Sequence, residues 1–216
     1  ARPRGSRTRD RMSSAGTSVA DMTTITIEPA TAARFDDVQH AFSGGGDGAS
    51  CQCQWWLISG TQFDAARREG REEMLRTELA AGPPPALIAY VDGEAGGWVR
   101  VGPRPAQPRL QRTRAFAASP EPWDDARVWA VTCFVIRREH RRQGLATRLL
   151  AAAVDHARAS GARVVEAYPT DTTVASPRAN ELYRGVLTTF LAAGFREVAR
   201  PKPHVAIVEL ELEPAA

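Results

Sequence analysis

Apolar positions repeat in two ways along the chain, and each repeat predicts a different kind of element. Ile25 and Ile27 alternate with polar residues in Thr24–Glu28, which is the period of a half-buried strand. Longer apolar runs follow, and the turn signal Asp92–Ala95 joins two of them into a hairpin. The predicted strands are Thr24–Glu28, Ala86–Val91, Gly96–Val101, Val128–Ile136, Arg163–Tyr168, Phe195–Val198 and Val205–Leu212.

Helical periodicity fills the spaces between these strands. Leu145, Leu149 and Ala153 share one face of Gly144–Ser160, as in a helix that packs on a sheet. The predicted helices are Pro29–Phe42, Phe63–Ala80, Gly144–Ser160 and Asn180–Ala193. The remaining connection, Pro103–Ala126, is too long for a loop in a compact domain unless it is functional or disordered. The order of elements predicts a single mixed α/β domain over residues 22–216.

Composition supports a globular protein and excludes several other classes. The chain has 216 residues, of which 43% are hydrophobic and 25% charged, so it can bury a core without disulfides. No apolar run approaches the roughly 18 residues of a membrane span, so no membrane partner is expected. The basic N-terminus has no apolar segment typical of a secretory signal, and we expect a cytoplasmic protein.

The net charge of +3 belongs to one end of the chain. Residues 1–21 contain five Arg and two acidic residues, and the other 195 residues contain as many acidic as basic groups. We expect this Arg-rich segment to be a disordered leader, because it cannot bury enough apolar surface. A nucleic-acid partner is therefore not expected for the folded part, although binding through the tail remains an alternative.

No metal site is expected from the cysteines and histidines. Cys51, Cys53 and Cys133 form no zinc-ligand spacing, and the four histidines are far apart in the sequence. Cys51 and Cys53 are candidate acyl-accepting thiols, but nothing in the sequence activates them.

The most informative segment is Val131–Thr147, in which an apolar strand runs into a basic turn and then an amphipathic helix. The first N–H groups of a helix have no internal partner and lie at the positive end of its dipole, so they bind phosphates well. Gly144 allows a phosphate to approach the backbone closely. The segment is neither a Walker loop nor a dinucleotide fingerprint. The glycine cluster Gly44–Gly48 follows no predicted strand and is not counted as a phosphate loop.

Arg141-x-x-Gly144-x-Ala146 resembles motif A of the GNAT superfamily of acyl-CoA-dependent N-acyltransferases, and Ala192–Phe195 resembles the helix-to-strand ending of that family. The resemblance implies a GNAT-like fold, a central mixed, mostly antiparallel sheet flanked by helices. It implies acetyl-CoA as co-substrate, with its pyrophosphate on the turn and its pantetheine arm along the strand. The cofactor-binding residues implied are Phe134, Val135, Ile136, Arg141, Arg142, Gln143, Gly144, Leu145, Ala146 and Thr147.

The resemblance leaves the catalytic groups open. The family's usual general acid is a tyrosine four residues before the Gly-Phe ending, where this chain has Phe190. Tyr183 and Tyr168 are the candidate substitutes, and a thiolate that leaves unassisted or takes its proton from solvent is the alternative. Glu166 is the candidate general base, since a carboxylate among apolar neighbours has a raised pKa. The competing interpretation is a Glu166 paired with an arginine, and Asp171 is expected to cap a loop.

The resemblance further implies transfer of an acetyl group to a primary amine of a small molecule or peptide, by direct attack in a ternary complex. Trp55, Trp56 and Trp123 are expected near the acceptor cleft or in ordinary packing, and Trp98 and Trp129 in the core. A homodimer is compatible with the sequence. The alternative function is a catalytically weak acyl-CoA-binding sensor.

Overall fold

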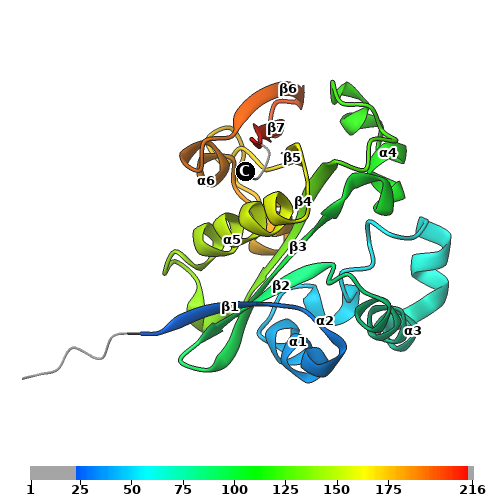
Figure 1. Cartoon of the computed structure of the whole chain (residues 1–216), viewed down its shortest axis with the longest axis vertical. Coiled ribbons are helices and arrows are strands. Elements are labelled where there is room, and N and C mark those ends of the chain that lie inside the picture. Colours follow the sequence, from blue (N-terminus) through cyan, green and yellow to red (C-terminus); the bar gives the residue numbers. More distant parts are fainter. Residues whose placement is uncertain (1–22, 214–216) are drawn as a thin grey trace, which may run out of the picture.

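The computed structural model describes residues 23–213, which form one seven-stranded sheet with helices on both faces (Figure 1). The predicted leader, residues 1–21, lies outside the described residues. Each predicted strand is present; β2 and β4 have the predicted bounds, and the ends of the other strands shift by at most four residues. The strands are β1 (Ile25–Pro29), β2 (Ala86–Val91), β3 (Glu94–Pro103), β4 (Val128–Ile136), β5 (Val164–Ala167), β6 (Arg196–Lys202) and β7 (Val205–Glu211).

The strand order β1-β2-β3-β4-β5-β7-β6 confirms the predicted mixed, mostly antiparallel sheet. Among the strands of residues 23–213, only β4 and β5 pair in parallel, and the helix α5 (Leu145–Ala159) connects them as a crossover requires. Their pairing is short, from Val128 opposite Val164 to Val131 opposite Ala167. β4 continues to Ile136 beside β3, so its last five residues extend beyond its pairing with β5.

Alternation along the strands divides the core between the two faces. Leu87 and Ala89 of β2 belong to the cluster under α5, where Leu149 and Leu150 are fully buried. Ile88 of β2 points to the opposite face and packs in the cluster of α1 (Phe35–Ser43) and α3 (Gly60–Ala81). Figure 1 shows α5 and the pair α1 and α3 on opposite sides of the sheet. Among the described residues, no helix is both long and apolar enough to cross a membrane.

Local signals explain where the helices depart from prediction. The 3-10 turn η1 (Ala32–Arg34) precedes α1, so the predicted helix from Pro29 begins later. α3 begins at Gly60 because Ser59 and Gln62 form a reciprocal capping box at its start. A short helix, α2 (Gly48–Cys51), occupies part of a segment without apolar periodicity.

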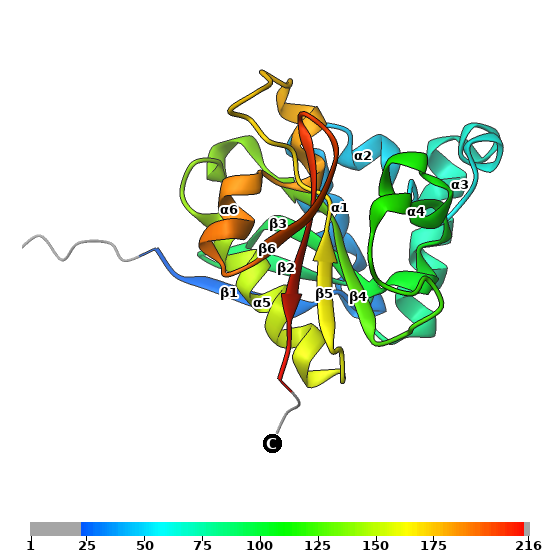
Figure 2. The same ribbon diagram turned by 90° about the horizontal axis from the view of Figure 1, so that it is seen from above.

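Two further segments differ from expectation. The predicted helix Asn180–Ala193 is split into η5 (Ala179–Arg184) and α6 (Leu187–Ala192), because Gly185 has φ 83°, which no helix interior adopts. The Pro103–Ala126 connection is folded in large part into the short helices η2 (Arg104–Ala106), α4 (Pro108–Arg112) and η3 (Arg114–Ala118). In Figure 2 α4 lies beside β4, on the side away from α5 and α6.

Candidate active site

The end of β4 exposes backbone groups toward an open side of the strand. The N–H of Arg137 donates to the Gly96 carbonyl on β3 at 3.0 Å. Because backbone groups alternate in direction along a strand, those of Ile136 and Phe134 point away from β3. The Ile136 carbonyl accepts a 3.0 Å hydrogen bond from Arg141 Nε on that side. β4 thus offers part of a strand edge where β5 no longer pairs with it.

The turn after β4 presents the start of α5 to the same side. Arg142 (φ 60°) and Gly144 (φ 77°) are both left-handed, a conformation that suits glycine, and a Cβ placed on Gly144 would meet no atom within 4 Å. The first backbone bond of the helix runs from Arg148 N–H to Gly144 O at 3.2 Å. The N–H groups of Leu145, Ala146 and Thr147 are therefore free of helical acceptors and lie at the positive end of the dipole.

A cleft of about 800 Å³ runs along both features. It brings together nine of the ten predicted cofactor-binding residues, which are Phe134, Val135, Ile136, Arg141, Arg142, Gly144, Leu145, Ala146 and Thr147. Gln143 does not line it, because its side-chain amide donates to the Glu139 carbonyl at 2.8 Å. Residues 45–48 also line the cleft, so the glycine cluster that was not counted as a phosphate loop borders the site.

Tyr183 lies in this cleft, and burial raises the pKa of its hydroxyl. Phe190, at the position of the family's usual acid, also lines the cleft and packs edge-on against Phe134 and Phe195. Tyr183 is therefore the one candidate acid among the three predicted catalytic residues that the structure places in the cleft.

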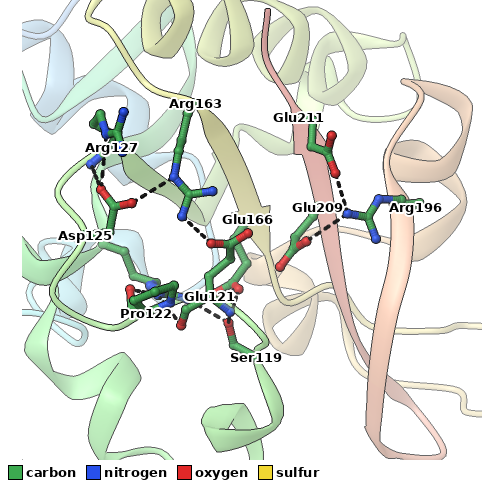
Figure 3. A network of polar contacts seen from close by, with 11 residues as sticks. Ser119, Glu121, Pro122, Asp125, Arg127, Arg163, Glu166, Arg196, Glu209 and Glu211 are labelled. Carbon is green, nitrogen blue, oxygen red and sulfur yellow. Dashed lines mark hydrogen bonds and ion pairs between the residues drawn. The ribbon is translucent and has the colours of Figure 1, made fainter.

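Glu166 and Tyr168 lie together elsewhere, and both side chains are fully buried. Figure 3 shows Glu166 within its network of polar contacts. Arg104 Nη1 donates to both carboxylate oxygens of Glu166 at 3.0 Å, and Ser119 and Tyr168 donate their hydroxyls to the same carboxylate. Burial raises the pKa of Tyr168 well above its ordinary value, and its ring stacks on Phe116. Neither Glu166 nor Tyr168 lines the cleft. The arrangement matches the arginine-paired interpretation of Glu166, and its catalytic role stays a prediction.

A second carboxylate, Glu209, is the cross-strand neighbour of Glu166 on β7, and Figure 3 shows the two side by side. Glu209 is 1% exposed, and its Oε1 has no hydrogen-bond partner within the described residues. Burial and then the charge of Glu166 raise the pKa of Glu209 to about 7. Asp171, by contrast, accepts the Thr173 N–H at 3.0 Å, as expected of a loop cap.

Cys53 has hydrogen-bond partners that the sequence did not reveal. Its sulfur accepts hydrogen bonds from Arg100 Nε at 3.2 Å and Trp98 Nε1 at 3.3 Å, and it borders the cleft. Burial opposes ionisation, but the hydrogen bond from Cys133 and the charge of Arg100 outweigh it and lower the pKa of Cys53 to about 6. Burial raises the pKa of the neighbouring Cys51 to about 11.

The tryptophans divide between site and core. Trp55 and Trp56 line the cleft, and the indole N–H of Trp56 is fixed by the Thr132 carbonyl at 3.2 Å. Trp98 and Trp129 are buried as expected, and Trp123 packs over the Arg104 guanidinium. Within residues 23–213, no three His, Cys, Asp or Glu side chains are grouped to hold a metal ion.

Solved structures with the same fold are numerous, although their sequences are distant. An N-acetyltransferase from Staphylococcus aureus Mu50 is 16% identical over 88% of this chain and 99% of its own, with a TM-score of 0.51. A paia N-acetyltransferase from Thermoplasma acidophilum, in complex with coenzyme A, is 14% identical over 88% and 99%, with a TM-score of 0.51. A ribosomal-protein-alanine N-acetyltransferase from Brucella melitensis is 18% identical over 87% and 99%, with a TM-score of 0.50.

Comparison with curated protein sequences found no match. The model of the acetyltransferase (GNAT) family matches residues 53–186, which include β4, the turn and α5. This match covers more than half of the chain, and the fold agrees with it. The chain belongs to the GNAT acetyltransferase family.

Proposed function

We propose that the protein is an N-acetyltransferase that transfers the acetyl group of acetyl-CoA to a primary amine of a small molecule or peptide. The observation that supports this most is the single cleft that joins the free edge of β4 to the start of α5. An amide-bearing pantetheine arm can pair with the Phe134 and Ile136 backbone as an added strand would. The pyrophosphate then meets the free N–H groups of α5 and the guanidinium groups of Arg141 and Arg142.

The chemistry is a direct displacement in a ternary complex. The amine nitrogen attacks the thioester carbonyl carbon, the new C–N bond forms, and the C–S bond breaks. The nitrogen loses one proton to water in the cleft, and the coenzyme A thiolate takes one from the Tyr183 hydroxyl, which solvent then restores. Holding both substrates side by side supplies much of the rate. This assignment gives Tyr183 the role that Phe190 cannot perform.

Binding is tested first, with two glycines of the same helix. Gly144→Glu places a carboxylate where the pyrophosphate is expected, whereas Gly161→Glu places one at the other end of α5, at a glycine of similar φ (82°) with equally open surroundings. We expect Gly144→Glu to abolish acetyl-CoA binding in calorimetry and Gly161→Glu to retain it. Equal binding by both variants would contradict the proposed cofactor site.

Catalysis is tested with Tyr183→Phe. Loss of a general acid lowers kcat by about 10²–10⁴-fold, while the KM for acetyl-CoA changes little because packing is kept. Tyr90→Phe is the matched control, since Tyr90 donates to Asp37 and lies outside the cleft. Release of the free coenzyme A thiol measures kcat and KM for both variants. An unchanged kcat in Tyr183→Phe would show that the thiolate leaves without this acid.

Phe190 supports one alternative, a sensor that binds acetyl-CoA without turning it over. Such a protein would bind acetyl-CoA in the calorimetric assay and release no thiol with any amine.

A further inference from the structure

A second cavity, of about 540 Å³, lies against the first one. Trp55, Trp56 and Tyr183 line both cavities, so the two cavities adjoin at these three side chains. The other lining residues come mainly from the start of α3, from α4, η3 and η5, and from the β6–β7 hairpin. A molecule in this cavity therefore lies next to a ligand in the first cleft.

The second cavity is strongly cationic. Arg109, Arg112, Arg184 and Lys202 line it, and its lining includes no Asp or Glu. Within residues 23–213, none of these four side chains forms an ion pair, whereas Arg100, Arg104, Arg163 and Arg200 each do. The cavity thus concentrates positive charge that the protein itself leaves uncompensated, which favours an anionic ligand.

Arg184 is the clearest example of an uncompensated cation in this cavity. Burial lowers the pKa of its guanidinium, and the side-chain hydrogen bond that it donates to the Thr170 hydroxyl is long, at 3.4 Å. Arg109 is held flat over the Trp55 ring, 3.4 Å from its centroid. A partly desolvated guanidinium with so few partners is stabilised when a carboxylate or phosphonate arrives.

Aromatic side chains supply the other half of the recognition. Trp55, Trp56, Phe116 and Tyr183 line the same cavity as the four cations. Trp56 is fixed by its hydrogen bond to Thr132, and Phe116 is 2% exposed, so these rings form a rigid apolar surface. The cavity therefore combines flat apolar walls with fixed cationic groups, as small-molecule sites commonly do.

We infer that the second cavity binds the acetyl acceptor, and that the acceptor is a small primary amine with an apolar or aromatic body and an anionic group. The anionic group contacts Arg112, Arg184 and Lys202, and the amine points to the place where the two cavities adjoin, toward the thioester. This inference rests on the proposed acetyltransferase function and adds the class of substrate to it.

The test uses pairs of amines in which one member has a carboxylate and the other the corresponding neutral amide. L-phenylalanine is compared with L-phenylalaninamide, and 4-(aminomethyl)benzoate with 4-(aminomethyl)benzamide, with release of coenzyme A thiol as the readout. A phosphonate analogue of phenylalanine distinguishes a preference for carboxylate from one for any anion. We expect kcat/KM to be at least about 10-fold higher for the anionic member of at least one pair.

Variants of the cavity identify where the anion binds. Arg184→Gln and Arg112→Gln are expected to raise the KM for the anionic amine by about 10-fold or more, with the KM for its neutral partner and for acetyl-CoA unchanged. Arg112→Lys keeps the charge and should restore most of the loss. Arg114→Gln is the control, because Arg114 is exposed in the same segment and lines neither cavity.

The possible outcomes distinguish failure of the anionic-acceptor inference from failure of the proposed acetyltransferase function. Preferred acetylation of the neutral amines, or a raised KM for acetyl-CoA in Arg112→Gln, overturns the anionic acceptor and leaves the acetyltransferase standing. If no amine is turned over, calorimetry on the complex of the protein with coenzyme A measures whether the second cavity prefers an anionic ligand. Tighter binding of N-acetyl-L-phenylalanine than of its amide supports the anion site, equal or weaker binding overturns it, and the missing turnover counts against the proposed function alone.

Discussion

Arg104 holds the buried network together, and its replacement tests how much of the stability depends on that network. Its guanidinium bonds to Glu166, to the Ser119 hydroxyl at 2.7 Å, and to the carbonyls of Glu121 and Pro122 at 2.9 and 2.5 Å. Both members of the ion pair are fully buried. Arg104→Met keeps most of the side-chain volume, removes these bonds, and leaves the Glu166 carboxylate without its cation.

The expected loss follows from that burial. Removing one partner of a buried ion pair destabilises a protein by about 3–5 kcal/mol, because the remaining charge is uncompensated. For a chain of this size, such a loss lowers Tm by about 10 °C. Urea unfolding followed by tryptophan fluorescence measures the free energy of unfolding directly. Arg163→Met is the matched control, since Arg163 pairs with Glu121 and Asp125 but its side chain is 33% exposed, and we expect a loss of about 1 kcal/mol.

A double-mutant cycle separates the interaction energy of the Arg104–Glu166 ion pair from the effect of changed packing around it. Arg104→Met/Glu166→Gln removes both charges, so its loss should be smaller than the sum of the two single losses by about 2 kcal/mol or more. A loss below about 1 kcal/mol in Arg104→Met, or strict additivity in the cycle, would refute the reasoning. Folded Glu166→Gln should also bind acetyl-CoA within about 2-fold of the parent protein, since Glu166 does not line the cleft.

Two further predictions concern groups with shifted pKa values. The pKa of Glu209 is raised from 4.5 to about 7, so the folded state binds more protons than the unfolded state between these values, and stability falls as pH rises through that window. Glu209→Gln should remove that part of the pH dependence and raise the free energy of unfolding at pH 8 by about 1–3 kcal/mol, measured by urea unfolding; no gain at pH 8 would contradict it. Cys53 should be alkylated by iodoacetamide with a half-maximal rate near pH 6, against about 8.5 for an ordinary thiol, and coenzyme A should protect it. Peptide mapping checks this against Cys51, whose pKa of about 11 predicts little reaction at that pH.

Features that depend on neighbours in the sequence were predictable. The strands β2 to β4, the helix α5 and the turn between β4 and α5 follow from apolar periodicity and from Gly144, and they contain most of the predicted cofactor-binding residues. Two misses had local signals. Gly185 interrupts the predicted last helix, and Pro108 stands at the first position of α4, where proline favours a helix start.

The remaining misses depend on contacts between distant segments. Arg104 and Glu166 are 62 positions apart, and Cys53 meets Arg100 across 47 positions. No periodicity links such residues, because the sheet and the folded 103–118 segment bring them together. The sequence therefore allowed Glu166 to be a general base or the partner of an arginine without identifying Arg104, and Cys53 looked like an ordinary thiol.

The contact between the two cavities at Trp55, Trp56 and Tyr183 has a consequence for inhibition. If acetyl-CoA and the acceptor bind as proposed, one molecule whose two halves are joined through the sulfur of coenzyme A would occupy both cavities. Once one half is bound, the other half meets its cavity at an effective concentration set by the short linker rather than by the solution. A conjugate of this kind loses its translational freedom once instead of twice, so two adjoining sites are a route to high affinity.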